Sequence, residues 1–461
     1  MMSNVESKLL AYAIFSLIPL FLFYIAISSV SVSPIQIFVV TSLLVMMVVV
    51  TLTVKDLGVC QPYFVVVIVT LLGVHAKYLY IISSQGTSTV VNEILLLGQG
   101  QNVLDSGLVF ILYAFTVMSL FYMISKKRQF TKPLAIQYYI HSGKFVYLAV
   151  IILVLSLLSF SYLIVFNDVG FTSGKKFSEE GSIPDNRFSS ISYYLLKISL
   201  LAKVSFYISL LSYLCHSKKM ISLILLIISF LATVVISYYV SNRAGLVVLV
   251  LDFIVITSLY KGKVQLKMIF TALLILVITI LVISANRSEV GAAKSVTDHI
   301  FGGRYLFDVT KNAHFYNYLS SGNQLFDYSS TTLLSDYVNL GRFAGHVVFG
   351  MPDSGVPLGY PVELFAVGGW LALTIGMAVL GVFYRTLTLL VAKKVVKDYM
   401  IVVYSIVMTR SGVYLFNNGI GVTVYQTFLD LVPFLIVIFL LKPRYGGLLR
   451  TKMTHLKLKN E

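Results

Sequence analysis

Arg243 stands at a sharp break between two long apolar stretches, in the segment VISYYVSNRAGLVVLVLDF. Its neighbours Ser241, Ala244 and Gly245 are small, so a ligand or another backbone can come close. Gly245 marks the expected start of the next helix, and the N-terminus of a helix binds anions. A guanidinium is a planar fork that grips two phosphate oxygens at once. The segment therefore predicts a phosphate site, and the competing explanation is an arginine that reaches lipid headgroups from the end of a span.

Other basic side chains interrupt apolar segments or follow them. Arg410, in VMTRSGVYLFNNG, lies inside a span. A charge there costs about 2.5–3.5 kcal/mol on insertion scales and usually faces a bundle interior or a wet cavity. Lys203 lies near the middle of another span and needs a partner or a cavity for the same reason. Arg287 closes a span, where reaching the headgroups is an equally good explanation. The expected anion-binding residues are Arg243, Arg287, Arg304, Arg342, Arg410 and Lys203.

A transfer reaction at a phosphate ester also needs a group that takes or gives a proton. Arg342 and His346 lie four residues apart in GRFAGHVV and would share one helical face. A neighbouring arginine disfavours the protonated histidine, which suits a base. Glu363, in GYPVELFAVGGW, begins a span and is the second catalytic candidate. An ordinary surface histidine and a carboxylate that complements its own helix dipole are the competing explanations.

The composition predicts an all-α polytopic membrane protein. Hydrophobic residues make up 58% of the chain and charged residues only 12%, against roughly 25% charged in soluble domains. Several stretches exceed the length of about 18 apolar residues that marks a membrane-spanning helix. The net charge of +16 would indicate nucleic acid in a soluble protein. Here the lysines cluster in short loops between apolar spans, as the positive-inside rule predicts, and we expect no nucleic-acid partner.

We expect about twelve membrane-spanning helices. Apolar length places them near 9–30, 34–54, 61–83, 103–124, 144–166, 191–215, 220–241, 244–260, 267–286, 362–391, 399–417 and 420–441. The basic clusters at 126–132, 218–219, 261–267, 393–397 and 442–452 each follow an even-numbered span, so both termini are expected in the cytoplasm.

One segment between two spans is far longer than a usual connection. Its aromatic and apolar residues at helical spacing predict a large ordered outer, periplasmic segment with short helices. The expected domains are 1–286 (the first nine spans), 287–361 (the outer segment), 362–441 (the last three spans) and 442–461 (a basic cytoplasmic tail).

Several kinds of chemistry have no sequence signal in this chain. It contains no Walker A loop, no HExxH and no CxxC. Its two cysteines, Cys60 and Cys215, lie near predicted cytoplasmic ends of spans, with several expected spans between them along the chain. This separation argues against a disulfide or a metal site. We expect neither a metal nor a cofactor.

The pattern resembles the Wzy-type polymerases of bacterial O-antigen and capsule repeat units, including the enterobacterial common antigen polymerase. The shared features are the number of spans, the short outer SNRAG hairpin, the large outer segment before the tenth span and the glycine-rich start of that span, PVELFAVGGWLAL. O-antigen ligases share this architecture and a similar hairpin with small residues and an arginine. The resemblance therefore implies a fold like that of the type-C glycosyltransferases.

The resemblance implies an enzyme at the outer face of the bacterial inner membrane. Such a glycosyltransferase moves a growing glycan from undecaprenyl pyrophosphate to the non-reducing end of another lipid-linked repeat unit. The implied partners are the undecaprenyl-pyrophosphate-linked oligosaccharide, membrane lipids and a chain-length regulator protein, with no metal or nucleotide. The arginines of the family carry over best to Arg243 and next to Arg304 or Arg342, and the outer-loop histidine of the ligases maps onto His346.

Two alternatives stay open at this point. An O-antigen ligase would share the arginine hairpin and the outer histidine. A lipid-linked oligosaccharide flippase or an ion-coupled transporter would also place charges inside spans, but it would not need a long ordered outer segment and would often show two matching halves.

The charge pattern makes a testable prediction about topology. A cysteine at position 330, in a background without Cys60 and Cys215, should react with an impermeant reagent added from the periplasmic side. A cysteine at position 263 should react only after the inner membrane is permeabilised. Labelling at 330 only after permeabilisation would refute both the topology and the function that depends on it.

Overall fold

The computed structural model describes ten segments of the chain. They are residues 60–83, 101–124, 135–137, 144–166, 190–215, 219–239, 243–262, 309–320, 358–392 and 395–440, with isolated positions at 41–49, 271 and 274. These residues are almost entirely helical. A bilayer offers no water to bond with backbone N–H and C=O groups. A helix pairs these groups within its own segment, so long apolar segments form helices there.

The helices follow one another along the chain as α3 (Pro62–Thr70), the π-helical turn η2 (Leu71–Ala76), α4 (Lys77–Ser83), α6 (Gln101–Ile124), α7 (Lys144–Phe166), α9 (Ser190–Ser199), α10 (Ala202–Cys215), α11 (Lys219–Tyr239), α12 (Arg243–Lys261), α15 (Val309–Ser320), α18 (Tyr360–Val391) and α19 (Asp398–Leu440). Two short strands, β1 (Ala135–Gln137) and β2 (Val395–Lys397), pair in parallel with Ala135 opposite Val395. This pairing joins two segments that are both predicted to lie on the cytoplasmic side.

Within the described part of the chain, six helices are long and apolar enough to cross a membrane. They are Asp105–Ile124, Lys144–Val165, Tyr194–Cys215, Met220–Tyr238, Tyr360–Val391 and Asp398–Leu440. Their outer faces are apolar: in α7, for example, Leu158 is 63% exposed and Val165 is 68% exposed. Such a face suits contact with lipid rather than water. The expected spans at 9–30 and 267–286 lie outside the described residues, so the total of twelve remains a prediction.

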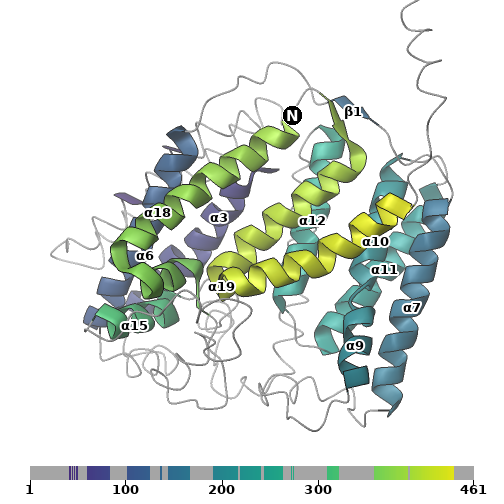
Figure 1. Ribbon diagram of the computed structural model, residues 1–461, viewed down its shortest axis with the longest axis horizontal. Coiled ribbons are helices and arrows are strands. Elements are labelled where there is room, and N and C mark those ends of the chain that lie inside the picture. The colour runs from purple at the N-terminus through teal and green to yellow at the C-terminus, as the bar shows by residue number, and fades with distance from the viewer. Residues whose placement is uncertain are drawn as a thin grey trace, which may run out of the picture.

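The spans expected at 399–417 and 420–441 form one bent helix, α19. Its backbone leaves helical geometry at Gly419, where φ is 79° and ψ is −177°. That left-handed region strongly favours glycine. Each side of the bend, 398–418 and 420–440, has about the twenty residues that cross a bilayer. Figure 1 shows the two sides as the arms of a V, and the bend lies where the expected spans 399–417 and 420–441 meet.

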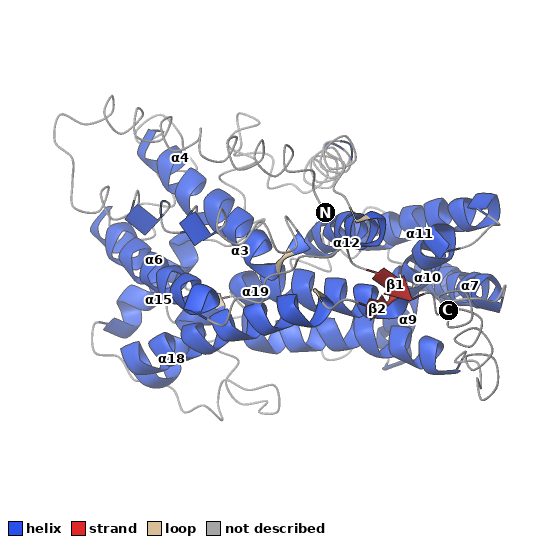
Figure 2. Cartoon of the chain, turned by 90° about the horizontal axis from the view of Figure 1, so that it is seen from above, coloured by secondary structure: helices blue, strands red, loops and turns tan. Residues whose placement is uncertain are grey.

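The long helix α19 lies between two groups of helices. Helices α6, α15 and α18 gather at one end of the molecule, and α7, α10 and α11 gather at the other (Figures 1 and 2). Helix α15 belongs to the expected outer segment. It packs so closely on α6 that a Cβ on Gly107 would overlap Ala313. The side chain of Asn312 accepts a hydrogen bond from the backbone N–H of Gly359 at 2.8 Å. The first contact joins α15 to α6, and the second joins it to the start of α18.

Candidate functional site

A fully buried arginine lies at the meeting point of three helical segments. Arg410 is in the first arm of α19, and its side chain is 0% exposed. Its Nη1 pairs with Oδ2 of Asp252 in α12. Its Nε and Nη2 donate to Oδ2 of Asp430, in the second arm of α19, at 2.9 and 2.6 Å. One guanidinium therefore holds α12 and both arms of the bent helix together.

Hydroxyl groups complete the coordination of the buried Asp252 carboxylate. Its Oδ1 accepts hydrogen bonds from Ser405 at 2.7 Å and Thr409 at 2.8 Å. Its Oδ2 accepts one from the Tyr207 hydroxyl at 2.6 Å, and the oxygen of that hydroxyl accepts from Nη2 of Arg410. A buried charge is tolerated only when it is both paired and hydrogen-bonded. This carboxylate meets both conditions.

Lys203 makes the cluster electrically neutral. Its Nζ lies 3.6 Å from Oδ1 of Asp430, and both side chains are almost fully buried. Two positive charges, on Lys203 and Arg410, thus face two negative charges, on Asp252 and Asp430. We call these four residues the charge cluster. The two expected anion-binding cations within it have their charges balanced by aspartates.

Lys203 lies just after an interruption between two helices. Helix α9 ends at Ser199 and α10 begins at Ala202. Across this interruption the backbone hydrogen bonds span three residues instead of the four of an α-helix. The N–H of Lys203, for example, donates to the carbonyl of Leu200 at 3.3 Å. Neither glycine nor proline stands at the interruption, so the sequence gives no local signal for it.

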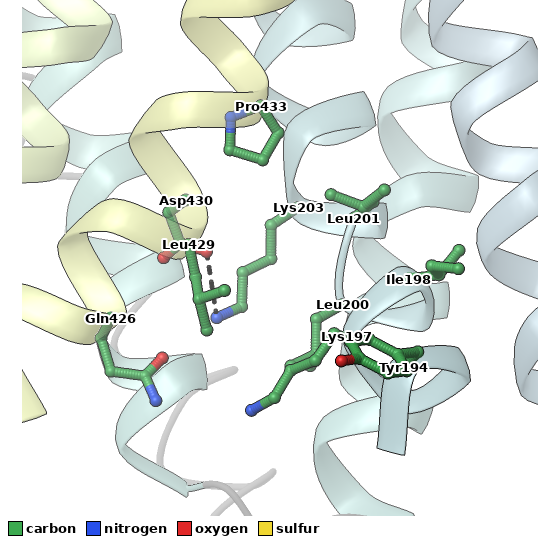
Figure 3. Close-up of a pocket in the computed structure, with 10 residues that line it drawn as sticks. All are labelled: Tyr194, Lys197, Ile198, Leu200, Leu201, Lys203, Gln426, Leu429, Asp430 and Pro433. Carbon is green, nitrogen blue, oxygen red and sulfur yellow. Dashed lines mark ion pairs between the residues drawn. The ribbon is translucent and has the colours of Figure 1, made fainter. Parts of the chain in front are cut away.

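A cavity of about 230 Å³ adjoins the pair of Lys203 and Asp430. Its lining comes from α9, α10 and the second arm of α19: Tyr194, Lys197, Ile198, Leu200, Leu201, Lys203, Gln426, Leu429, Asp430 and Pro433. In Figure 3 the Lys203 side chain extends to Asp430, while the ends of Lys197 and Gln426 point toward the lower part of the view. Proline has no backbone N–H to donate, so α19 lacks one backbone hydrogen bond at Pro433, which lines the cavity.

Glu363 holds the bend of α19. It lies in the first turn of α18, and its Oε2 accepts a hydrogen bond of 2.8 Å from the backbone N–H of Ile420, the first residue after Gly419. A Cβ on Gly419 would overlap this carboxylate. The Glu363 oxygen satisfies one backbone N–H at the start of the second arm, as a capping side chain does. The carboxylate therefore caps a neighbouring helix rather than its own, and its proposed role in catalysis stays a prediction.

The remaining predicted site residues divide into two groups. Arg243 is the first residue of α12, nine residues before Asp252, which corresponds to about 14 Å along a helix axis. The side chain of Arg243 lies outside the described residues. The others lie entirely outside them: Arg287, Arg304, Arg342 and His346.

Sequence reasoning missed the two aspartates of the charge cluster. Asp252 interrupts LVLDFIV and Asp430 interrupts FLDLVPF, both within apolar runs. The insertion cost that singles out Arg410 and Lys203 applies to these carboxylates as well. A search of the apolar runs for acidic residues that could balance Arg410 and Lys203 would have found both aspartates.

The fold and the site together define a helical chain with six candidate membrane spans in its described part and a neutral charge cluster buried among them. Comparison with protein-family models, with curated proteins and with solved structures finds no match. Among the described residues, no group of three His, Cys, Asp or Glu side chains could hold a metal ion. The function must therefore be argued from the site and from the sequence pattern.

The neutrality of the charge cluster predicts how its variants rank in stability. Asp430→Asn leaves a net charge of +1 in the bundle and should cost about 3–5 kcal/mol, as breaking a buried pair does. The double variant Lys203→Met with Asp430→Asn restores neutrality and should recover part of that loss. Thermal unfolding of the purified chain in detergent measures both. A double variant no more stable than Asp430→Asn would show that charge balance is not what stabilises the cluster.

The contact of Glu363 with Ile420 predicts different outcomes for two substitutions. Glu363→Gln keeps an oxygen that can accept the bond and should unfold at nearly the same temperature as the natural chain. Glu363→Ala loses the cap and should cost about 1 kcal/mol. Equal destabilisation by both would contradict the capping role. Activity then separates the two roles of the carboxylate: loss of activity in a stable Glu363→Gln protein assigns proton transfer, and retained activity assigns capping alone.

Proposed function

We propose that this chain polymerises lipid-linked oligosaccharide repeat units at the outer face of the bacterial inner membrane. The observation that carries the proposal is the position of Arg243 at the first residue of α12, a helix anchored in the bundle by the pair of Asp252 and Arg410. The free N–H groups and the dipole of a helix N-terminus favour an anion there. An arginine added at this place fits the pyrophosphate of a lipid-linked sugar donor.

The proposed reaction transfers a glycan between two lipid carriers. The hydroxyl oxygen at the non-reducing end of the acceptor unit bonds to the anomeric carbon of the donor glycan, and the bond from that carbon to the pyrophosphate oxygen breaks. The hydroxyl proton passes to a base, for which His346 and Glu363 are the proposed groups. Negative charge grows on the departing undecaprenyl pyrophosphate, and a fixed cation stabilises that charge without moving.

The charge cluster supports the proposal through the rigidity that it gives to α12. Arg243 gains catalytic value only if its position is held during the reaction, because a misplacement of about 1 Å can cost a hundredfold in rate. Asp252 lies on the same helix and has bonds to Arg410, Tyr207 and Ser405. These contacts reach α10 and α19, so α12 is fixed to two other helices.

A transporter of lipid-linked oligosaccharides is the second candidate. The interruption between α9 and α10 and the bend of α19 lie beside a buried ion pair, and broken helices beside charged groups are common in transporters. Glycan electrophoresis of a deletion strain separates the candidates. Loss of the polymerase leaves single repeat units on the surface, whereas loss of a flippase removes the surface glycan. Loss of a ligase leaves lipid-linked polymer that is never attached.

Arg243 carries the sharpest prediction of this proposal. In a deletion strain, Arg243→Ala should lower the polymerisation rate about a hundred- to a thousandfold, as removing one charge-stabilising donor does. Arg243→Lys should also lose most activity, because an ammonium cannot grip two oxygens at once. Polymer length on a glycan ladder, read beside the protein level, measures the effect.

The matched control is Lys261→Ala, which removes a positive charge from the opposite end of the same helix. It should leave polymer length unchanged. Long polymer made by Arg243→Ala at normal abundance would show that Arg243 only reaches the lipid headgroups and would remove this site assignment.

A further inference from the structure

We infer that the cavity between α9, α10 and the second arm of α19 binds an uncharged amphiphile by its hydroxyl group, with Lys203 and Asp430 as the residues that contact the hydroxyl. The ligand class is a membrane alcohol, which joins a hydrocarbon chain to a hydroxyl and carries no charge. The site goes beyond the proposed function, since its ligand is neither a phosphate nor a glycan and Arg243 is not among the lining residues.

The pair of Lys203 and Asp430 can take a further polar atom. Nζ of the lysine lies 3.6 Å from Oδ1 of the aspartate, whereas an N–H···O bond is about 2.7–3.2 Å long. An ammonium has three N–H donors, and each carboxylate oxygen can accept more than one bond. Both bonds from Arg410 end on the other oxygen, Oδ2. The ammonium and Oδ1 can therefore each bond to a ligand, and both residues line the cavity (Figure 3).

The charge balance around this pair favours an uncharged ligand. The charge cluster, to which the pair belongs, contains two positive and two negative groups. An added ion would bring a net charge into the buried bundle, which is costly unless that charge is itself paired. Lys197 also lines the cavity, and its ammonium is already engaged with the ring of Tyr425, 4.9 Å from Nζ to the ring centre.

A hydroxyl is an uncharged group that suits both members of the pair, because it accepts one hydrogen bond and donates another. Its oxygen can lie about 2.8 Å from both Nζ of Lys203 and Oδ1 of Asp430, since these two atoms are 3.6 Å apart. It then accepts from the ammonium and donates to the carboxylate. Hydrogen bonds to charged groups are stronger than those between neutral groups. An ether oxygen could accept but not donate.

The rest of the wall favours hydrocarbon over water. Five of the ten lining residues are aliphatic or proline: Ile198, Leu200, Leu201, Leu429 and Pro433. A buried water makes about three hydrogen bonds, and these side chains offer none. A hydrocarbon chain gains roughly 25 cal/mol for each Å² of apolar surface that it buries. The ligand that satisfies both the ion pair and this wall is an alcohol with a hydrocarbon chain.

The cavity runs from the lipid-facing surface to the buried pair. Tyr194 is 64% exposed and Ile198 is 37% exposed, whereas Lys203 is 2% exposed. All three belong to one candidate membrane span, Tyr194–Cys215, so a molecule that enters past the exposed rim comes from the membrane. An apolar cavity of about 150 Å³ accommodates benzene, and this one measures about 230 Å³. It holds the hydroxyl and the first carbons, and the rest of the chain lies outside.

Photolabelling of the whole purified chain tests the inference. The protein is placed in nanodiscs of dioleoyl phosphatidylcholine, a lipid without a hydroxyl group, and the probe is 1-octanol with a diazirine on its chain. Labelled peptides are identified by mass spectrometry. Labelling should fall in residues 194–201 and 426–433, which contain nine of the ten lining residues. Labelling confined to other segments would overturn the site, whatever the variants do.

Competitors, compared at equal concentrations in the membrane, show which chemistry is recognised. Unlabelled 1-octanol should compete about tenfold better than octyl methyl ether, which cannot donate, since a hydrogen bond to a charged group has about that strength. Octanoate and octylammonium each carry a charge and should also compete about tenfold less well. Equal or better competition by the ether or by either ion would overturn the hydroxyl assignment.

Dioctanoylglycerol distinguishes the two sources of such an alcohol. Its glycerol carries one hydroxyl beside two acyl chains, whereas 1-octanol is a simple alcohol. Stronger competition by dioctanoylglycerol than by 1-octanol assigns an acylglycerol, and weaker competition assigns a simple long-chain alcohol.

Two variants attack the site independently. Leu429→Trp fills the cavity while keeping both charged residues, and it should lower labelling about tenfold or more. Leu158→Trp is the matched control, because Leu158 is 63% exposed on α7 and is not among the lining residues. The double variant Lys203→Met with Asp430→Leu removes both polar contacts, keeps the charge cluster neutral and should lower labelling to a similar extent.

The melting temperature of each variant shows whether it is folded. Unchanged labelling of a folded Leu429→Trp protein would overturn the site, and unchanged labelling of a folded double variant would overturn the role of the pair. If the double variant does not fold, the comparison of 1-octanol with its ether decides that role in the natural chain.

The outcome is separable from that of the proposed function. Labelling of the cavity in a protein that makes no polymer in cells leaves the alcohol site standing and removes the polymerase proposal. Normal polymer length in cells with no labelling of the cavity removes the alcohol site alone.

Discussion

The arrangement of the helices depends on one buried arginine and the two carboxylates that neutralise it. Arg410 and Asp430 are twenty residues apart in α19, which in a straight helix would separate them by about 30 Å. They meet because α19 bends at Gly419, nearly halfway between them. Asp252 then brings α12 to the same guanidinium. Removing one partner of a buried ion pair costs about 3–5 kcal/mol, so the pairing of Arg410 with Asp430 stabilises the bend that makes it possible.

The bend is stabilised by groups outside the charge cluster. At Gly419 the backbone adopts a positive φ, and the Glu363 carboxylate occupies the space of a missing Cβ. The bond from Ile420 to Glu363 satisfies a backbone N–H that the break leaves free. Helix α18 thereby sets the angle at which the second arm of α19 returns. The first turn of α18 thus positions Asp430, although the two are not in direct contact.

The sequence predicts the local features of this structure and misses those created by tertiary contact. The apolar stretches at 103–124 and 144–166 coincide with α6 and α7 within two residues, because hydrophobic length is a property of the segment itself. The same reasoning places Arg410 and Lys203 in the bundle interior. It does not find the pairing of Arg410 with Asp430, since these two residues meet only when α19 bends. The capping by Glu363 escapes for the same reason, as it needs α18 to approach a break in another helix.

The charge cluster is held unequally on its two sides, and this asymmetry relates it to the cavity. Arg410 makes hydrogen bonds of 2.9 and 2.6 Å to one oxygen of Asp430, whereas Lys203 approaches the other oxygen only to 3.6 Å. Lys203 also lines the cavity. The bonds that join α12 to both arms of α19 therefore do not depend on Lys203. The lysine balances the charge at the edge of the bundle, whereas the guanidinium holds the helices together.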